Sequence, residues 1–372
     1  MSSSSAERAR NVLTRTFSLG SLTLPNRVVM SPMTREFSPD GVPGRDVAQY
    51  YTRRAAGGVG LIITEGTYVG HDSAGTSARV PHFYGDDALA GWSAVADSVH
   101  QAGGRIMPQL WHVGMERAVG AAPVPGAPRT GPSGIALDGS YSGEAMTQAD
   151  IDNVIAAYAT SAAAAEALGF DGVEIHGGHG YLVDQFLWAY TNRRTDGYGG
   201  DVASRTRFAA EVVAACRESV SREFPILFRL SQWKVNRYQA KIAETPQQLE
   251  TILTLLSEAG ADAFHCSTRR FYLPEFEGSD LNLAGWAKKL SGKPSISVGS
   301  VGLTNEFIQV FQGEQSEVTG IDRLLDRLER DEFDLIAVGR ALLGDPEWLT
   351  KTLDGRTEEL SPFHVGILGT LH

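Results

Sequence analysis

The chain has 372 residues, of which 42% are hydrophobic and 21% charged, and it carries a formal net charge of −11. This size fits two domains or one large α/β barrel, and we expect a single domain over residues 1–372 because no repeat, charge run or linker divides the sequence. The acidic balance disfavours nucleic acid or an anionic membrane surface as a partner, although a locally basic phosphate pocket is compatible with it.

The compartment follows from the cysteines and the N-terminus. Cys216 and Cys266 are isolated, with no spacing suited to zinc or an iron–sulfur cluster, and two lone thiols fit a reducing compartment. Residues Met1–Glu7 lack the apolar core of a secretory signal, and no apolar run approaches the ~20 residues of a membrane span. We therefore expect a globular cytoplasmic protein.

The first predicted element is a small hairpin. Phe17–Leu19 and Leu22–Leu24 alternate around Gly20-Ser21, a pattern typical of two short strands joined by a tight turn. A frayed terminus is the alternative. We favour a hairpin that closes the bottom of the barrel described next.

Short apolar segments then alternate with helical patterns, which indicates a parallel sheet with crossover helices. Eight β/α units predict an α/β fold, a single (β/α)8 TIM barrel. The expected strands are Arg27–Met30, Gly60–Thr64, Arg105–Leu110, Gly172–His176, Ile226–Leu230, Ala263–Cys266, Ser295–Val298 and Asp334–Val338. Helical patterns between them include Ala156–Leu168, Ser204–Ser219, Pro246–Ala259 and Ile321–Glu329.

The segment Val113–Glu144 after the third strand is too long for a simple connection and is rich in proline and glycine. Since a TIM barrel builds its active site from the loops that follow its strands, we expect a long loop over the site here.

Polar residues follow several predicted strands, at the barrel end where active sites form. Gln109 carries one carbonyl and one amide, the groups needed to bind the imide-like edge of an isoalloxazine ring. Arg229 places a permanent cation in an apolar strand, so it should face negative charge. That charge is either a reduced flavin or a carboxylate partner.

The seventh and eighth strands end in Gly299-Ser300 and Gly339-Arg340. TIM barrels often hold a phosphate at these two strand ends, where glycines let backbone N–H groups approach the oxygens and an arginine can grip two of them. The sequence contains neither a dinucleotide-binding G-x-G-x-x-G after a strand nor a Walker A motif. Bound flavin mononucleotide (FMN) fits this pattern better than a Rossmann-bound dinucleotide.

The fourth strand ends in the densest cluster, in which His176, His179 and Tyr181 lie within six positions and are separated by glycines. A sharp turn there would point both imidazoles at one substrate oxygen. The alternative, that each imidazole only bonds a neighbouring carbonyl, fits a lone histidine better than this cluster.

These segments resemble the Old Yellow Enzyme group of FMN-dependent ene-reductases. The resemblance covers most of the chain, and the stretch Thr191–Gly200 is highly specific to that group. It implies that FMN contacts Pro32, Met33, Thr34, Gly66, Gln109 and Arg229, and that its phosphate contacts Gly299, Ser300, Gly339 and Arg340. It further implies that His176 and His179 hold the substrate oxygen, that Trp111 shapes the substrate pocket, and that Tyr181 donates a proton.

The resemblance also implies a reaction and its partners. NADPH or NADH would reduce FMN, and the reduced flavin would transfer hydride to a small electrophilic alkene conjugated to a carbonyl or nitro group. A homo-oligomer is compatible with it. The segment Cys266–Ser279 is expected to be mostly a packed surface loop, with a pocket wall or a nicotinamide contact as the alternative.

Two other functions fit parts of the pattern. A metal-dependent TIM-barrel hydrolase would use His176 and His179 as ligands, with His112 and His265 as further candidates, although no metal is expected. A non-catalytic FMN-binding protein would bind flavin without turnover, and it would leave the cluster of two histidines and a tyrosine unexplained.

Overall fold

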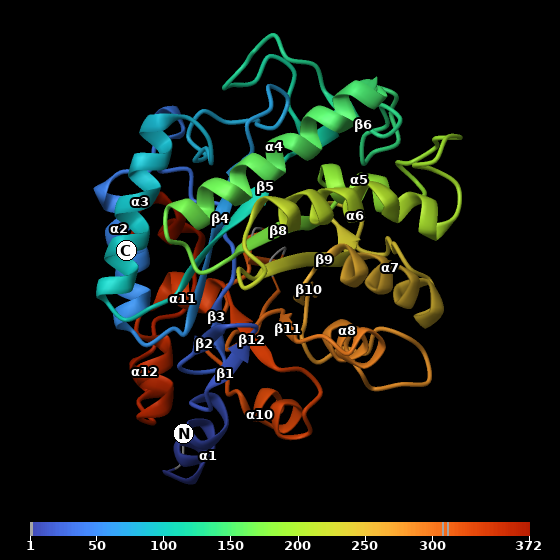
Figure 1. Cartoon of the computed structure of the whole chain (residues 1–372). Coiled ribbons are helices and arrows are strands. Elements are labelled where there is room, and N and C mark those ends of the chain that lie inside the picture. The colour runs from blue at the N-terminus through green and yellow to red at the C-terminus, as the bar shows by residue number, and fades with distance from the viewer. Residues whose placement is uncertain (1–2, 307–308, 311) are drawn as a thin grey trace.

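The computed structural model describes residues 3–306, 309–310 and 312–372. Its centre is a closed barrel in which β10, β11, β12, β3, β4, β5, β8 and β9 follow one another, each paired in parallel with the next (Figure 1). All eight predicted strands are present, so the TIM-barrel prediction is confirmed. The strands are β3 Val28–Met30, β4 Leu61–Tyr68, β5 Ile106–Trp111, β8 Val173–His179, β9 Ile226–Lys234, β10 Ala263–Ser267, β11 Ser295–Val298 and β12 Leu335–Val338.

Several strands run further than predicted, because the apolar pattern ends before the hydrogen-bonded ladder does. β4 continues beyond Thr64 to Tyr68, and β9 continues beyond Leu230 to Lys234. The added residues are largely polar, yet nearly all of them are buried. These extensions carry polar side chains to the C-terminal end of the barrel.

Helices surround the barrel, and α4, α6, α7 and α8 pack in succession against its outside (Figure 1). The predicted helix Ala156–Leu168 starts eight residues earlier, at Gln148, because Thr147 and Asp150 form a capping box that the pattern did not reveal. The N-terminal helix α1 was not predicted. The helices are α1 Ser3–Leu13, α2 Arg45–Ala56, α3 Asp86–Gln101, α4 Gln148–Ala167, α5 Leu182–Leu187, α6 Val202–Ser219, α7 Pro246–Ala259, α8 Leu283–Ser291, α10 Asp322–Glu329, α11 Arg340–Gly344 and α12 Trp348–Leu353.

Within the described ranges, no helix has the length and apolar character needed to cross a membrane. Cys216 and Cys266 are both buried free thiols.

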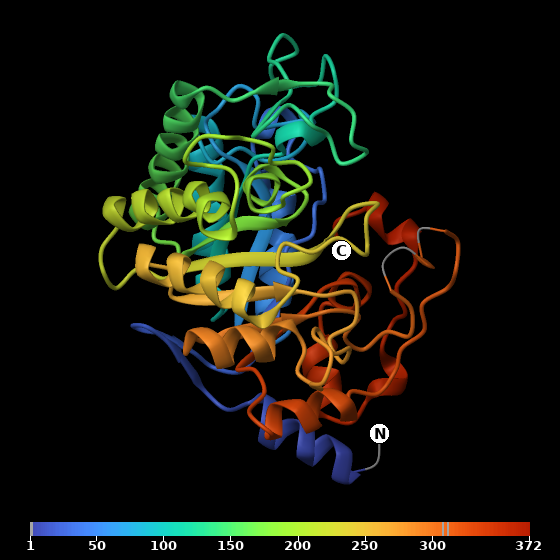
Figure 2. The ribbon, with the colours of Figure 1, turned by 90° about the vertical axis from the view of Figure 1, so that its right-hand side faces the viewer.

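The predicted hairpin is confirmed as β1 Phe17–Leu19 paired antiparallel with β2 Leu22–Leu24. Leu19 and Leu24 are fully buried and belong to the cluster that fills the barrel interior, together with residues near the starts of strands such as Leu61 and Leu335. The hairpin therefore closes the N-terminal end of the barrel. In Figure 2 it projects at the left of the molecule.

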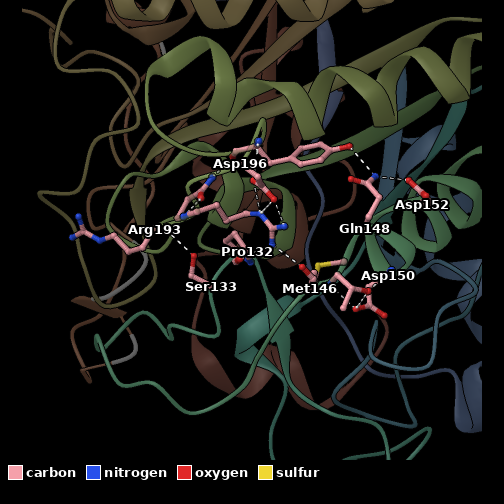
Figure 3. A network of polar contacts seen from close by, with 12 residues as sticks. Pro132, Ser133, Met146, Gln148, Asp150, Asp152, Arg193 and Asp196 are labelled. Atoms are coloured by element: carbon pink, nitrogen blue, oxygen red, sulfur yellow. Dashed lines mark hydrogen bonds and ion pairs between the residues drawn. The ribbon is translucent and has the colours of Figure 1, made fainter.

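The long segment after β5 contains a 3-10 turn, Gly114–Glu116, and its base is closed by β6 Thr130–Gly131 paired with β7 Glu144–Ala145. Arg194 ties this base together, since its Nη1 donates to the carbonyls of Pro132 (2.9 Å) and Met146 (2.6 Å) (Figure 3). Asp196 holds the same guanidinium at 2.6 Å. The family-specific stretch Thr191–Gly200 thus contains a structural clamp.

Candidate functional site

A cavity of about 500 Å³ opens at the C-terminal ends of the strands. All the residues predicted for the site line it: Pro32, Met33, Thr34, Gly66, Gln109, Trp111, His176, His179, Tyr181, Arg229, Gly299, Ser300, Gly339 and Arg340. The structure thus brings together segments from most of the strands, whereas the role of each residue stays a prediction.

The pairing register of neighbouring strands brings several polar side chains to the same height in the barrel wall. On adjacent strands His176 of β8 pairs with Arg229 of β9, and Arg229 pairs with His265 of β10. Gln109 of β5 pairs with Glu174 of β8 on the other side. Five polar residues therefore converge in one part of the barrel wall.

The turn after β8 has an unusual backbone. His179 adopts a left-handed conformation with φ 65°, which costs free energy for a residue with a side chain, and Gly180 follows with φ 90°. Ser231 accepts from the N–H of His179 at 2.8 Å, and the His179 carbonyl accepts from the N–H of Val235 at 3.2 Å. These contacts with β9 and the residue after it hold the turn in place.

A buried ion pair lies behind this turn. Lys234 Nζ is 2.9 Å from the Asp184 carboxylate, and both side chains are fully buried. Asp184 also accepts from the N–H of Gly180 at 2.5 Å. Burial raises the pKa of Asp184 to about 6, although Lys234 opposes this rise.

The two site histidines belong to a continuous chain of hydrogen bonds. Gln109 Nε2 donates to Glu174 at 2.7 Å, and Gln109 Oε1 lies 2.9 Å from His176 Nδ1. His176 Nε2 lies 3.0 Å from His179 Nδ1, and His179 Nε2 lies 2.8 Å from the hydroxyl of Ser267. Both imidazoles are therefore fully hydrogen-bonded within the protein.

Burial sets the protonation states at this end of the cavity. It lowers the pKa of His176 and of His179 well below the ordinary range, and the nearby Arg229 lowers both further. Burial raises the pKa of Tyr181 to about 12, with a smaller contribution from Glu116. At neutral pH the imidazoles are therefore uncharged and the phenol keeps its proton.

Aromatic packing fixes the wall around these groups. The Trp111 ring lies 6.0 Å from that of His176 in a stacked orientation and 4.9 Å from that of Tyr181, edge to face. A Cβ atom at Gly66 would lie 2.6 Å from the Trp111 ring, so the tryptophan requires glycine at that position.

Arg229 is buried without a directly bonded carboxylate among the described residues. Its Nη2 contacts Ser31 Oγ at 3.3 Å, and its Nε has no partner. Burial lowers the pKa of this guanidinium, and the more distant Glu174 partly offsets the effect. Of the two alternatives for its counter-charge, the geometry favours a bound anion over a direct carboxylate contact.

Arg340, at the end of the cavity away from the histidines, is also a cation with an unpaired donor atom. Its Nη2 donates to Ser300 Oγ (3.2 Å) and to the Asn305 carbonyl (2.6 Å), while Nη1 is buried without a partner. Burial lowers its pKa to about 10. A half-buried cation with one buried, unused donor, beside Gly339, fits an anionic group such as a phosphate.

Sequence reasoning missed several residues that line the cavity, including Trp233, Tyr238, Glu306, Phe363 and Leu368. Trp233 packs 4.6 Å from His179, ring to ring, and its indole N–H donates to the Ser267 carbonyl. Trp233 lies three positions beyond the predicted end of the fifth strand, and this position could have indicated from the sequence that it lines the cavity.

Of the two segments that were expected near the site, one contributes residues to the cavity wall and the other does not. In the segment Cys266–Ser279, Ser267, Thr268 and Arg269 line the cavity, whereas Phe271 is buried in the core. The described cavity lining includes no residue of the long segment Val113–Glu144, so its role as a loop over the site stays a prediction. That segment instead contacts the site from outside, since the Leu137 side chain packs on Gly180.

The histidines considered as metal ligands have other partners. His112 bonds His71 at 3.0 Å, and His265 bonds Glu174 at 2.6 Å. Within the part of the chain that the structure describes, no group of three or more His, Cys, Asp or Glu side chains is arranged to hold a metal ion. The geometry therefore gives the metal-dependent hydrolase no support.

Comparison with known sequences identifies the family. The profile of the NADH:flavin oxidoreductase / NADH oxidase family matches residues 13–359. A flavin oxidoreductase of Emericella nidulans is 34% identical, with 91% of this chain and 89% of the relative covered. An NADH oxidase of Thermoanaerobacter brockii is 32% identical over 92% of this chain, which spans 50% of that relative's length.

Solved structures agree with this result. Morphinone reductase has a TM-score of 0.79 and 29% identity, covering 96% of this chain and 92% of its own, and a second structure of that enzyme contains tetrahydroNAD. An Old Yellow Enzyme from Pichia sp. AKU4542 has a TM-score of 0.79 and 25% identity, covering 96% and 90%. Fold, cavity and relatives together define an FMN-dependent oxidoreductase that uses NADH or NADPH. The chain belongs to the NADH:flavin oxidoreductase / NADH oxidase family, within its Old Yellow Enzyme group.

Proposed function

We propose that this protein reduces the C=C bond of α,β-unsaturated carbonyl or nitro compounds. The observation that carries the proposal is the meeting of His176, His179 and Tyr181 at one end of the cavity whose other walls suit a flavin. Hydrogen-bond donors and a proton source are the two things that addition of hydride to such an alkene needs from a protein.

The proposed FMN site uses two cations that each have a buried, unpaired donor atom. The unpaired atoms of Arg229 and Arg340 would face the anionic ring edge and the phosphate, and Gln109 would bind the pyrimidine edge. The remaining residues proposed to hold FMN are Pro32, Met33, Thr34, Gly66, Gly299, Ser300 and Gly339. FMN, when bound, supplies the hydride chemistry, with NADH or NADPH as the source of electrons.

His176 and His179 anchor and activate the substrate in this proposal. An oxygen that enters between the two rings would replace the 3.0 Å hydrogen bond that joins them. Negative charge grows on this oxygen as hydride reaches the β carbon, so the hydrogen bonds that it receives strengthen in the transition state. Trp111 and Trp233 flank the pair.

Tyr181 is the proposed acid. With a pKa raised to about 12 it stays protonated at neutral pH, and it delivers its proton to the α carbon, which carries the electron pair after hydride addition. Its ring centroid lies 5.2 Å from that of His176, so both act on one substrate. The phenolate then regains a proton from solvent.

Anaerobic single-turnover oxidation tests the proposal. The purified holoenzyme, reduced with NADPH or NADH, is mixed with a panel of enones, nitroalkenes and nitrate esters while flavin absorbance is followed and products are identified. We expect flavin reoxidation matched by saturated ketones or nitroalkanes. Bound FMN that is reduced by the nucleotide, yet is reoxidised by no member of the panel, would overturn the assignment and favour a non-catalytic flavin-binding protein.

A further inference from the structure

Two buried ionisable residues beneath the site have no part in the mechanism above. Glu174 of β8 and His265 of β10 are both fully buried. One carboxylate oxygen of Glu174 lies 2.6 Å from His265 Nδ1, and the other accepts from Gln109 Nε2 at 2.7 Å. Since Gln109 continues to His176, this pair forms the inner end of the hydrogen-bond chain.

The carboxylate of Glu174 at the inner end fixes which group donates and which accepts in each of these hydrogen bonds. An ionised carboxylate only accepts hydrogen bonds, so Gln109 must turn its amide nitrogen to Glu174 and its carbonyl oxygen to His176. His176 must then carry its hydrogen on Nδ1, which leaves a lone pair on Nε2. His179 donates to this lone pair from Nδ1, and its own Nε2 accepts from the Ser267 hydroxyl.

We propose that Glu174, held by His265, is a positioning residue that fixes the tautomers of His176 and His179, so that the pair binds an oxyanion only with uptake of one proton. The inference rests on the proposed role of the two imidazoles as the oxygen anchor. Between the rings only His179 offers an N–H, because His176 presents a lone pair that repels an anion. A proton on His176 Nε2 would convert this repulsion into a second, charge-assisted hydrogen bond.

The charges around the two imidazoles keep them neutral until an anionic ligand binds. Arg229 and Lys234 of β9 and His265 of β10 face the pair, and each disfavours a positive charge on His179. Tyr181 lies beside the rings as a neutral phenol, and Lys234 is already paired with Asp184. Without a ligand the imidazoles therefore stay neutral, and a bound anion supplies the compensating charge.

Isothermal titration of the oxidised holoenzyme with 4-nitrophenol tests this coupling. Measurements are made above the pKa of the free phenol, in buffers of different ionisation enthalpy, so that the dependence on buffer counts protons. For the wild type we expect uptake of about one proton per bound phenolate. In Glu174→Gln the new amide can donate a hydrogen bond, so the side-chain amide of Gln109 can flip. His176 can then carry its hydrogen on Nε2, and proton uptake on phenolate binding should fall towards zero.

Two companion variants separate positioning from general damage. Glu174→Asp keeps a carboxylate and should retain the uptake. Glu332→Gln neutralises another buried carboxylate, one bonded to Arg327 on a different part of the molecule, and should leave the uptake unchanged. Nitrogen-15 NMR of the ligand-free holoenzyme should show the His176 hydrogen on Nδ1 in the wild type and on Nε2 in Glu174→Gln.

The outcomes are distinguishable from those for the proposed function. Unchanged proton uptake in a folded, FMN-loaded Glu174→Gln enzyme would overturn the inference. If that variant does not fold, the wild type decides, because binding of phenolate without uptake also overturns it. Unchanged phenol affinity after removal of both imidazoles would instead overturn the oxygen anchor itself.

Discussion

The two ends of the cavity differ in how completely their polar groups are bonded. At the imidazole end every ring nitrogen of His176 and His179 has a partner within the protein. At the other end Arg340 Nη1 is buried without one, and Arg229 Nε, on the strand next to His176, also lacks a partner. A buried polar atom without a partner costs roughly 1–3 kcal/mol, so these guanidinium groups are suited to a permanent anionic occupant.

The difference separates a cofactor site from a substrate site. FMN adds partners that the arginines lack, so its binding should stabilise the fold. A substrate oxygen must displace a hydrogen bond that already exists between the imidazoles, so it gains less free energy on binding and can leave after the reaction. The following predictions test this contrast, from the largest expected effect to the smallest.

Tyr181→Phe should slow the oxidative half-reaction with enones by ~10²–10⁴-fold, because a positioned general acid contributes that much. Reduction of the flavin by NADPH or NADH should be nearly unchanged. Stopped-flow measurement of each half-reaction checks this, with Tyr141→Phe at an exposed position as the control. Nitroalkenes sharpen it, because their nitronate product leaves without protonation. Equal slowing by enones and nitroalkenes would remove Tyr181 from the proton-donor role.

Removing both imidazoles in His176→Ala, His179→Ala should weaken phenol binding by ~100-fold or more, given roughly 1.5–3 kcal/mol for each hydrogen bond to a charged group. The long-wavelength charge-transfer band of phenolate over oxidised flavin should disappear with it. Titration followed by absorbance measures both. Retained affinity would show that the oxygen binds elsewhere in the cavity.

Arg340→Ala should raise the Kd of FMN by ~10- to 100-fold, because a charge-assisted phosphate contact of roughly 1.5–3 kcal/mol is lost. Fluorescence titration of the apoprotein measures the Kd. Arg193→Ala is a matched control, since that side chain is exposed and points away from its network (Figure 3). Equal FMN affinity in both variants would contradict the phosphate site.

Glu65→Gln should change the pH dependence of thermal stability by a few degrees. Burial raises the pKa of Glu65 to about 7, so the folded state holds its proton in a range where the unfolded state has lost it. The contribution of protonated Glu65 to the free energy of unfolding is therefore lost as pH rises from about 4.5 towards 7. A glutamine does not titrate, so the variant lacks this loss. The variant should gain in Tm relative to the wild type at pH 8 more than at pH 5. Exposed Glu358→Gln is the control, and a difference in Tm that is independent of pH would contradict the assignment.

The barrel was predictable because its strands are short apolar runs separated by turns and helical patterns. Their C-terminal ends could be located, which is why Gln109, His176, Arg229 and Arg340 could be assigned to one site from the sequence alone. Helix α1 was not predictable in the same way, because its serine-rich start has the composition of a disordered terminus.

The missed parts of the site depend on contacts between distant segments. Phe363 and Leu368 reach the cavity from a C-terminal segment of short turns, without a periodic pattern, and Glu306 reaches it through an ion pair with Arg269. Glu174 did carry a signal, because a carboxylate within an apolar strand requires a buried partner. Its partner His265 lies on another strand, so only the register of β8, β9 and β10 reveals the pair.

The Arg194 clamp has a consequence for engineering. One guanidinium joins the carbonyls of Pro132 and Met146, so the chain between them leaves and returns to the barrel at points that Arg194 holds together. This segment is therefore an exchangeable module. Replacements from relatives can be grafted between these two positions to vary the packing on Gly180 and the adjoining Tyr181, while the barrel and its cofactor site stay unaltered.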